Sequence, residues 1–348
     1  LSIITFISSV TGTFLVRSGI LNSVHTFAND PSRGLYILIF LTLMIVSSFF
    51  IFIRRGIKDK FYFEALSKET FILSNNWFMM FYLLTVFIGT VYPIFTQVLY
   101  DTKISVGPPF YNLVIGPIIV PFLILMAIGP KINWIKEKYK VLKSLILVII
   151  ISCILNFIIF YFFRGYNFIS NLIIISSLFL IFSSIKDFIL SKKNNSFLNV
   201  SSFISHLGFG TLIFFIILNH NFSKDFDLNI KVGETKKIEN IEIKFQSLNI
   251  ENRKNYNAIV GNFNIYNLKK NYQRILKPEI RVYDKPETLT FETAINSNFK
   301  RDLYLTMSNI DGSEFYNVKF QMKPFMLLIW LAAFLTASGG LIRIFIKK

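Results

Sequence analysis

The chain alternates between long apolar runs and short polar connections, with one long polar stretch near its C-terminal end. An α-helix needs about 20 apolar residues to cross the hydrocarbon core of a bilayer. Eight runs approach that length, at 1–16, 34–53, 77–95, 113–129, 144–163, 168–190, 201–218 and 325–345. We expect each run to be a transmembrane helix, the first being short because the sequence begins inside it. The opening Leu1 suggests a fragment or the second piece of a split protein.

The long polar stretch lies between the seventh and the eighth run and shows a different periodicity. Apolar and polar residues alternate in short segments such as 241–245 and 279–283, and Gly and Asn separate these segments. Alternation with a period of two predicts β-strands with one buried face. We therefore expect a helical bundle at 1–218, a small β-barrel-like or sandwich domain at 219–323, and a last helix with a basic tail at 324–348. The fold class is a polytopic α-helical membrane protein with one external β-rich domain.

The composition agrees with a membrane protein, because 53% of the residues are hydrophobic and only 16% are charged, against about 25% charged in soluble domains. The formal net charge is +17. Sixteen Lys and Arg residues lie in the short connections of one side and four in those of the other. Positive charge marks the cytoplasmic side, so the β-rich domain and the first connection, 17–33, face outward. The basic charge has no accompanying RNA-binding motif or basic face, which excludes nucleic acid as a partner.

Few residues offer chemistry. The single cysteine, Cys153, lies inside an apolar run, so neither a disulfide nor a zinc site can be built within the chain. Motifs of hydrolases and phosphate-binding loops are absent. Of the three histidines, His206 lies inside the seventh run, where an ionisable group is costly without a partner. It is equally compatible with an axial haem ligand and with an interhelical hydrogen bond. Gly208 and Gly210 would let a flat macrocycle or another helix approach the backbone. His25, in the first outer connection, is more typical of a solvated residue. His220, at the end of the seventh run, is more typical of a residue at the membrane interface.

Several short motifs, taken in order, resemble the CcmF family of cytochrome c-type biogenesis proteins. The first is TGTFLVRSG at 11–19, which runs on to SVH at 23–25. The others are KISVGPPFYN at 103–112, SHLG at 205–208, PE at 278–279 with RVY at 281–283, RDLY at 301–304 and KPF at 323–325. Each motif is weak alone, but the collinear set covers the whole chain and resembles the part of the family that follows its tryptophan-rich WWD domain.

The resemblance implies a haem lyase in the bacterial inner membrane, or in the mitochondrial inner membrane if an organelle encodes it. In the family, the histidine at the position of His25 is an external ligand to haem awaiting transfer. The histidine at the position of His206 is an intramembrane ligand to a permanently bound haem b. The WWD signature and the second histidine of each ligand pair lie upstream in the family and are missing here. An N-terminal half carrying the WWD domain would have to supply them.

The family mechanism implies a haem chaperone that delivers haem, an apocytochrome c with a CxxCH motif, and maturation subunits that include a thiol-reducing component. Haem b would keep the transferred haem iron reduced. We expect Arg17 to pair with a haem propionate, because it lies eight residues before His25. The turn Gly107-Pro108-Pro109, in an outer connection at 97–112, would form a rigid part of the haem rim. Two alternatives are a transporter of haem or another solute, and a non-catalytic scaffold that docks apocytochrome and its thiol-reducing partners. Transporter helices are often interrupted, in corresponding positions of two repeated halves. Pro117 and Pro121 interrupt the fourth run, but the sequence has no matching second half.

Overall fold

The computed structural model describes residues 2–18, 31–55, 62, 64–102, 104–135, 140–162, 167–192, 198–267, 272–284, 287–310 and 312–345. The chain divides into two compact units, Leu1–Ile146 and Leu147–Lys348. Each unit is described by itself.

The first unit is built from helical pairs. Its elements are α1 (Ser2–Arg17), α2 (Pro31–Arg55), α3 (Lys68–Tyr100), α4 (Pro108–Ile128) and the short 3₁₀ helix η1 (Gly129–Lys131), and α1 packs on α2 as α3 packs on α4. Glycines permit both contacts. A Cβ atom on Gly34 would lie 2.9 Å from Cα of Ser18, and one on Gly89 would lie 2.5 Å from the Tyr111 hydroxyl oxygen.

The prolines of α4 act differently from the expectation. Pro117 and Pro121 lie inside a continuous helix and do not interrupt it, which corrects the prediction. Spanning helices tolerate proline because neighbouring helices and small local adjustments satisfy the freed carbonyl groups. The predicted outer connection at 97–112 is also too long. α3 continues to Tyr100, where Asp101 ends it in the left-handed conformation with φ of 51°, and α4 begins at Pro108. Proline favours the first helical turn, since its φ is already helical and its missing N–H has no partner there.

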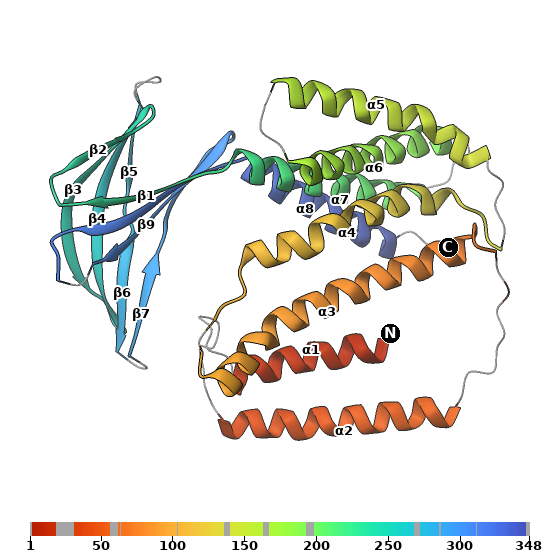
Figure 1. Cartoon of the computed structure of the whole chain (residues 1–348), viewed down its shortest axis with the longest axis horizontal. Coiled ribbons are helices and arrows are strands. Elements are labelled where there is room, and N and C mark those ends of the chain that lie inside the picture. The colour runs from red at the N-terminus through yellow and green to blue at the C-terminus, as the bar shows by residue number, and fades with distance from the viewer. Residues whose placement is uncertain are drawn as a thin grey trace. The chain divides into compact units, whose positions relative to one another are not determined.

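The second unit joins a helical layer to a β domain. Its helices are α5 (Lys140–Phe162), which crosses the boundary between the units, α6 (Phe168–Lys192), α7 (Leu198–Phe222) and α8 (Met326–Phe345). α7 packs against both α6 and α8, and the three helices run side by side in Figure 1. α6 is the most enclosed of them. Its buried serines, such as Ser177 and Ser184, donate to backbone carbonyl groups one turn earlier at 2.9 and 2.8 Å.

Small residues let α7 and α8 meet closely. Ser201 of α7 donates a hydrogen bond of 2.7 Å to the carbonyl oxygen of Gly339 in α8. One turn further, a Cβ atom on Gly339 would lie 2.5 Å from the backbone nitrogen of Ser205. A Cβ atom on Gly208 would lie 2.5 Å from the backbone nitrogen of Thr336. In lipid, helices associate through such close packing, because apolar burial gives no net driving force there.

The β domain contains two antiparallel sheets. Its strands are β1 (Lys224–Ile230), β2 (Thr235–Ile238), β3 (Ile241–Asn252), β4 (Tyr256–Asn267), β5 (Tyr272–Leu276), β6 (Glu279–Asp284), β7 (Glu287–Glu292), β8 (Ala294–Ser297), β9 (Arg301–Asn309) and β10 (Tyr316–Pro324). One sheet has the order β1-β10-β9-β8. The other has the order β2-β3-β4-β6-β7, with β5 also paired to β4. Figure 1 shows the domain inserted between α7 and α8.

The inner faces of the two sheets form one apolar core. Alternate residues of β3 enter it, and the ring of Phe245 stacks on that of Phe263 with centroids 4.2 Å apart. Leu305 and Phe320 from the other sheet complete the same cluster. The strands thus form a sandwich of two sheets. Of the two forms that the sequence left open, the sandwich is therefore confirmed and the barrel-like form is wrong.

The predicted fold class is confirmed. Among the described residues, seven helices are long and apolar enough to span a membrane, and α1 is a shorter apolar helix of 16 residues. The β domain precedes the last helix, as expected. A multi-pass membrane protein with one inserted β-sandwich is therefore the architecture.

Two neighbouring glycines of α8 test the packing argument. Gly339→Ala should lower the free energy of unfolding by about 1–3 kcal/mol, because its methyl group overlaps Ser205. Gly340→Ala is the matched control, since a Cβ atom at Gly340 has nothing within 4 Å and alanine favours a helix by about 1 kcal/mol over glycine. The measurement is thermal unfolding of the purified chain in detergent. Equal behaviour of the two variants would contradict close contact of α7 with α8.

Candidate functional site

His206 lies within the span of α7, a helix of 25 residues. At a rise of 1.5 Å per residue it lies about 12 Å along the axis from the first residue of the helix. Its side chain is half-buried. An imidazole at this depth is far from bulk water, and its position on the helix decides what it can contact.

One side of α7 near His206 packs on α6. Phe203 and Gly210 lie three residues before and four residues after His206, so the three residues share a face of the helix. The ring of Phe203 stacks on that of Phe188 of α6, with centroids 4.3 Å apart and an interplanar angle of 16°. A Cβ atom on Gly210 would lie 2.9 Å from Cγ1 of Ile181 in α6. His206 is therefore held at the flank of a tight α6–α7 contact.

The nearly opposite side of α7 packs on α8 through Ser201, Ser205 and Gly208. The sequence allowed either a flat macrocycle or another helix to lie beside Gly208 and Gly210. In the structure each glycine faces a helix: Gly208 faces Thr336 of α8 and Gly210 faces Ile181 of α6. Their missing side chains thus serve helix packing and leave no slot for a macrocycle at those two positions. Packing on both sides restricts the orientation of His206.

The donor set around His206 is small. Within the described ranges, no group of three or more His, Cys, Asp or Glu residues is placed to hold a metal ion. An imidazole nitrogen is one of the donors that haem iron takes as an axial ligand. An imidazole nitrogen is thus the donor that this part of α7 would offer to a haem iron.

The predicted outer site involves His25 and Arg17. His25 lies outside the described residues. Arg17 is the last residue of α1, and its side chain is exposed. Ser18, directly after α1, lies against Gly34 in the first turn of α2.

The Gly107-Pro108-Pro109 turn starts α4. Gly107 is the extended residue before the helix, with φ of −106°, and Pro108 and Pro109 form its first turn with exposed side chains. The turn belongs to the first unit, whereas His206 belongs to the second. The turn and His206 are therefore described separately, each within its own unit.

His220 lies in the last turn of α7 and is exposed. Fourteen residues separate it from His206, which corresponds to about 21 Å along the helix axis. It does not share a local site with His206.

The outer face of the larger β sheet carries a polar cluster that sequence reasoning did not single out. Arg281 of β6 donates through Nε to Glu279 at 2.7 Å and lies 4.9 Å from the ring centroid of Tyr256. The hydrogen bond to Glu279 raises the pKa of Arg281. Tyr256 and Tyr283 are paired across β4 and β6, with ring centroids 5.1 Å apart. The alternation of Glu279, Arg281 and Tyr283 was the available signal, because alternate residues of a strand share a face. Exposed Tyr and Arg are enriched in protein interfaces.

Comparison with known proteins shows the same region of one family throughout. A family model described as the CcmF C-terminal beta-sandwich matches residues 221–324. The chain is similar to cytochrome c-type biogenesis protein CcmF of Haemophilus influenzae, with 30% identity over 364 residues, covering 100% of this chain and 56% of that protein. It is 28% identical to CcmF of Escherichia coli K12 over 356 residues, covering 99% of this chain and 54% of that protein.

A further relative and a solved structure give the same result. The chain is 27% identical to cytochrome c-type biogenesis protein NrfE of Haemophilus influenzae, covering 99% of this chain and 55% of that protein. A solved structure of the cytochrome c heme lyase CcmF covers 97% of this chain with a TM-score of 0.69, and this chain covers 58% of that one. Its identity is 17%, so this likeness shows the fold alone. The chain spans about half the length of the curated relatives that it matches.

Proposed function

Because the chain belongs to the CcmF family and corresponds to the C-terminal half of its members, we propose that it is the C-terminal part of a membrane haem lyase that attaches haem to apocytochrome c. The observation that carries the proposal is the half-buried imidazole of His206 on a spanning helix, held between two packed neighbours. An ionisable side chain within a spanning helix is rare and marks a candidate functional site by default.

In this proposal His206 would be one of the residues that hold a resident haem b. When bound, haem b supplies one-electron chemistry that can reduce a second haem. The stacked Phe203–Phe188 pair and the α8 contact of Gly208 fix the helix on which His206 is carried. Restricting the imidazole in this way lowers the entropy lost when it binds iron. The N-terminal half would supply the other residue that holds this haem.

His25 holds the substrate haem at the outer surface, with an upstream histidine on the other side of the iron. The apocytochrome presents the two thiols of its CxxCH motif. Each sulfur forms a bond to a haem vinyl carbon, while the thiol hydrogen goes to the neighbouring vinyl carbon, so no atom is lost. Arg17, exposed at the end of α1, pairs with a propionate of this haem. The residues 107–109 form part of the rim around it.

The proposal includes the partners that this reaction needs: a haem chaperone, apocytochrome c, a thiol-reducing maturation component and the N-terminal half with its WWD domain. The compartment is the bacterial inner membrane, with the β domain on the outer side. The cluster of Tyr256, Arg281 and Tyr283 favours an additional scaffold role, since such residues often anchor partner proteins. A transporter gains no support from α4, because Pro117 and Pro121 leave that helix continuous.

The sidedness can be tested by cysteine labelling. In a Cys153→Ser background, Asn249→Cys at an exposed position of β3 should react from outside with an impermeant maleimide, whereas Lys58→Cys should react only after the membrane is opened. The charge asymmetry of the connections is the reason. Protection at Asn249 together with reaction at Lys58 would reverse the topology.

The rim role of the 107–109 turn predicts an effect on activity beyond stability. The double variant Pro108→Ala and Pro109→Ala should keep α4, because Gly107 still precedes the helix and alanine is a strong helix former. Holocytochrome c yield, measured by haem staining, should fall more than the amount of the chain in the membrane. Parallel losses of both would leave these prolines only a role in starting α4.

The two principal histidines should differ in what their loss removes. With the N-terminal half co-expressed, His206→Ala should abolish the haem b absorbance, because no water replaces the ligand at membrane depth. His25→Ala should retain that absorbance and abolish holocytochrome c formation, and exogenous imidazole should restore activity to it more readily.

His220→Ala is the matched control on α7 and should change neither readout, since that side chain is exposed at the end of the helix. Absorbance spectra and haem-stained gels of all three variants provide the measurement. If His25→Ala removed the haem b absorbance while His206→Ala retained it, the two assignments would be reversed.

A further inference from the structure

A small cavity lies where the β domain joins α7 and α8. Its volume is about 280 Å³, and Phe222, Lys224, Glu239, Arg301, Met322 and Phe325 are among the residues that line it. Its walls come from the end of α7, the first strand of the β domain, the turn between β2 and β3, and the two strands that lead to α8. The cavity is therefore built from segments far apart in the sequence.

The position of the cavity coincides with the ends of two spanning helices. α7 ends at Phe222 and α8 begins at Met326. The side-chain amide of Asn219 donates to the carbonyl oxygen of Pro324 at 2.5 Å, which joins the last turn of α7 to the start of α8. Where spanning helices end, the hydrocarbon core gives way to the lipid headgroups. The cavity thus lies at the level of the headgroups, whichever side of the membrane the β domain occupies.

The backbone at the cavity is strained. Phe325 has φ of 63°, in the left-handed region, which is unusual for a bulky residue. Its N–H donates to the carbonyl oxygen of Lys300 at 3.2 Å, and its ring lies 6.0 and 6.2 Å from those of Phe215 and Phe222. This conformation places an aromatic ring in the cavity wall. The cavity therefore has an apolar wall directly below charged groups.

The charged groups of the cavity are mainly positive. Nζ of Lys224 lies 2.6 Å from Oε1 of Glu239, and both side chains are about half exposed. The guanidinium group of Arg301 has one hydrogen-bond partner among the described residues, the sulfur of Met322 at 3.3 Å. A thioether is a weak acceptor, so most of the five N–H donors of Arg301 remain available for a stronger one. Glu239 thus neutralises the charge of Lys224, whereas the sulfur of Met322 does not neutralise that of Arg301.

We propose that this cavity binds the phosphodiester headgroup of an anionic membrane phospholipid. Arg301 donates to the phosphate oxygens, Lys224 offsets the negative charge of Glu239 that would otherwise repel the phosphate, and the apolar wall of Phe222, Met322 and Phe325 contacts the glycerol and the first part of the acyl chains. A planar guanidinium group suits phosphate oxygens, because two parallel N–H donors match two of them. The proposal is independent of the haem lyase function.

The small size of the cavity favours a headgroup over a whole haem. Cavities that enclose whole cofactors or drug-sized ligands usually measure about 300–1,000 Å³, so a cavity of about 280 Å³ at the protein surface suits a headgroup better than a macrocycle. Free phosphate has the same anionic oxygens, but it would make no use of the apolar wall. A bound lipid would also connect the β domain to the bilayer at the point where the two join.

Native mass spectrometry of the delipidated full chain tests the proposal with dioleoyl phosphatidylglycerol as the probe. Arg301→Gln should weaken the tightest binding event about tenfold, as expected for the loss of one hydrogen bond to a charged group. Lys224→Gln should weaken it in the same direction, because it leaves Glu239 unpaired beside the phosphate, and it changes a side chain that is only half-buried. Inorganic phosphate and glycerol phosphate at millimolar concentration should not displace the lipid.

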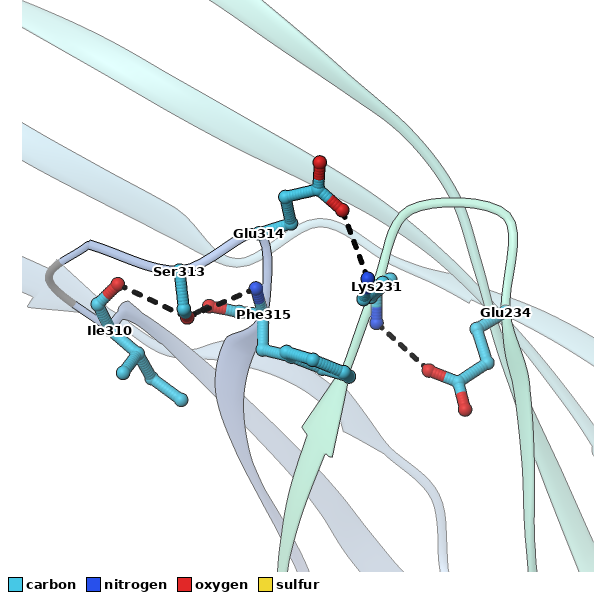
Figure 2. Close-up of polar contacts among 6 residues, drawn as sticks. All are labelled: Lys231, Glu234, Ile310, Ser313, Glu314 and Phe315. Atoms are coloured by element: carbon cyan, nitrogen blue, oxygen red, sulfur yellow. Dashed lines mark hydrogen bonds and ion pairs between the residues drawn. The ribbon is translucent and has the colours of Figure 1, made fainter.

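Lys231→Gln is the matched control. Lys231 follows the other end of β1, where Nζ lies 2.9 Å from Oε2 of Glu314 and 4.6 Å from the ring centroid of Phe315, as Figure 2 shows for the ion pair. The Lys231→Gln substitution removes the same charge from the same domain and should leave lipid binding unchanged. Unaltered binding in both Arg301→Gln and Lys224→Gln would overturn the proposal. Displacement by inorganic phosphate would overturn the lipid as the ligand, and displacement by haem at equal concentration would assign the cavity to a propionate.

Discussion

The absence of water inside a bilayer governs how this chain must fold. Lipid tails are as apolar as leucine, so the helices gain little from burying apolar side chains and must instead approach one another closely. α7 makes two such contacts, through Gly208 against α8 and through Gly210 against α6. The hydrogen bond from Ser201 to the carbonyl oxygen of Gly339 adds a polar link between helices. These contacts fix α7, and with it both His206 and the two points at which the β domain is attached.

Most of the fold could be predicted from the sequence, because its two dominant signals are strong. Apolar runs of spanning length indicate helices whatever their neighbours are, and the alternation in 241–245 places Ile241, Ile243 and Phe245 on one buried face. The ends of helices were harder to predict. α3 begins earlier than hydropathy suggested, because polar residues such as Ser74 and Asn75 lie inside it. α3 continues to Tyr100 and Pro108 begins α4, so the connection between these two helices is shorter than hydropathy suggested. Sandwich and barrel have the same alternation, and only the pairing of the strands separates them.

The candidate site was less predictable, because its geometry depends on tertiary contacts. Glycines near His206 have the same appearance in sequence whether they face a macrocycle or a helix, and only the contacts to Thr336 and Ile181 decide. The cavity at Arg301 could not be anticipated at all. Its lining residues are up to 103 positions apart, from Phe222 to Phe325, and the left-handed conformation of Phe325 has no local sequence signal such as glycine.

The same constraint bears on the proposed haem site, in which His206 would supply one donor. His206 shares the side of α7 that packs on α6 with Phe203 and Gly210. A haem iron held by two imidazoles would need a second donor. The chain spans about half the length of its relatives, so the N-terminal half is the natural source. A site divided in this way would couple haem binding to assembly, because the resident haem could be held only after the two halves have met. Small-residue contacts therefore do more than join helices, because they also hold in place the helix that carries His206.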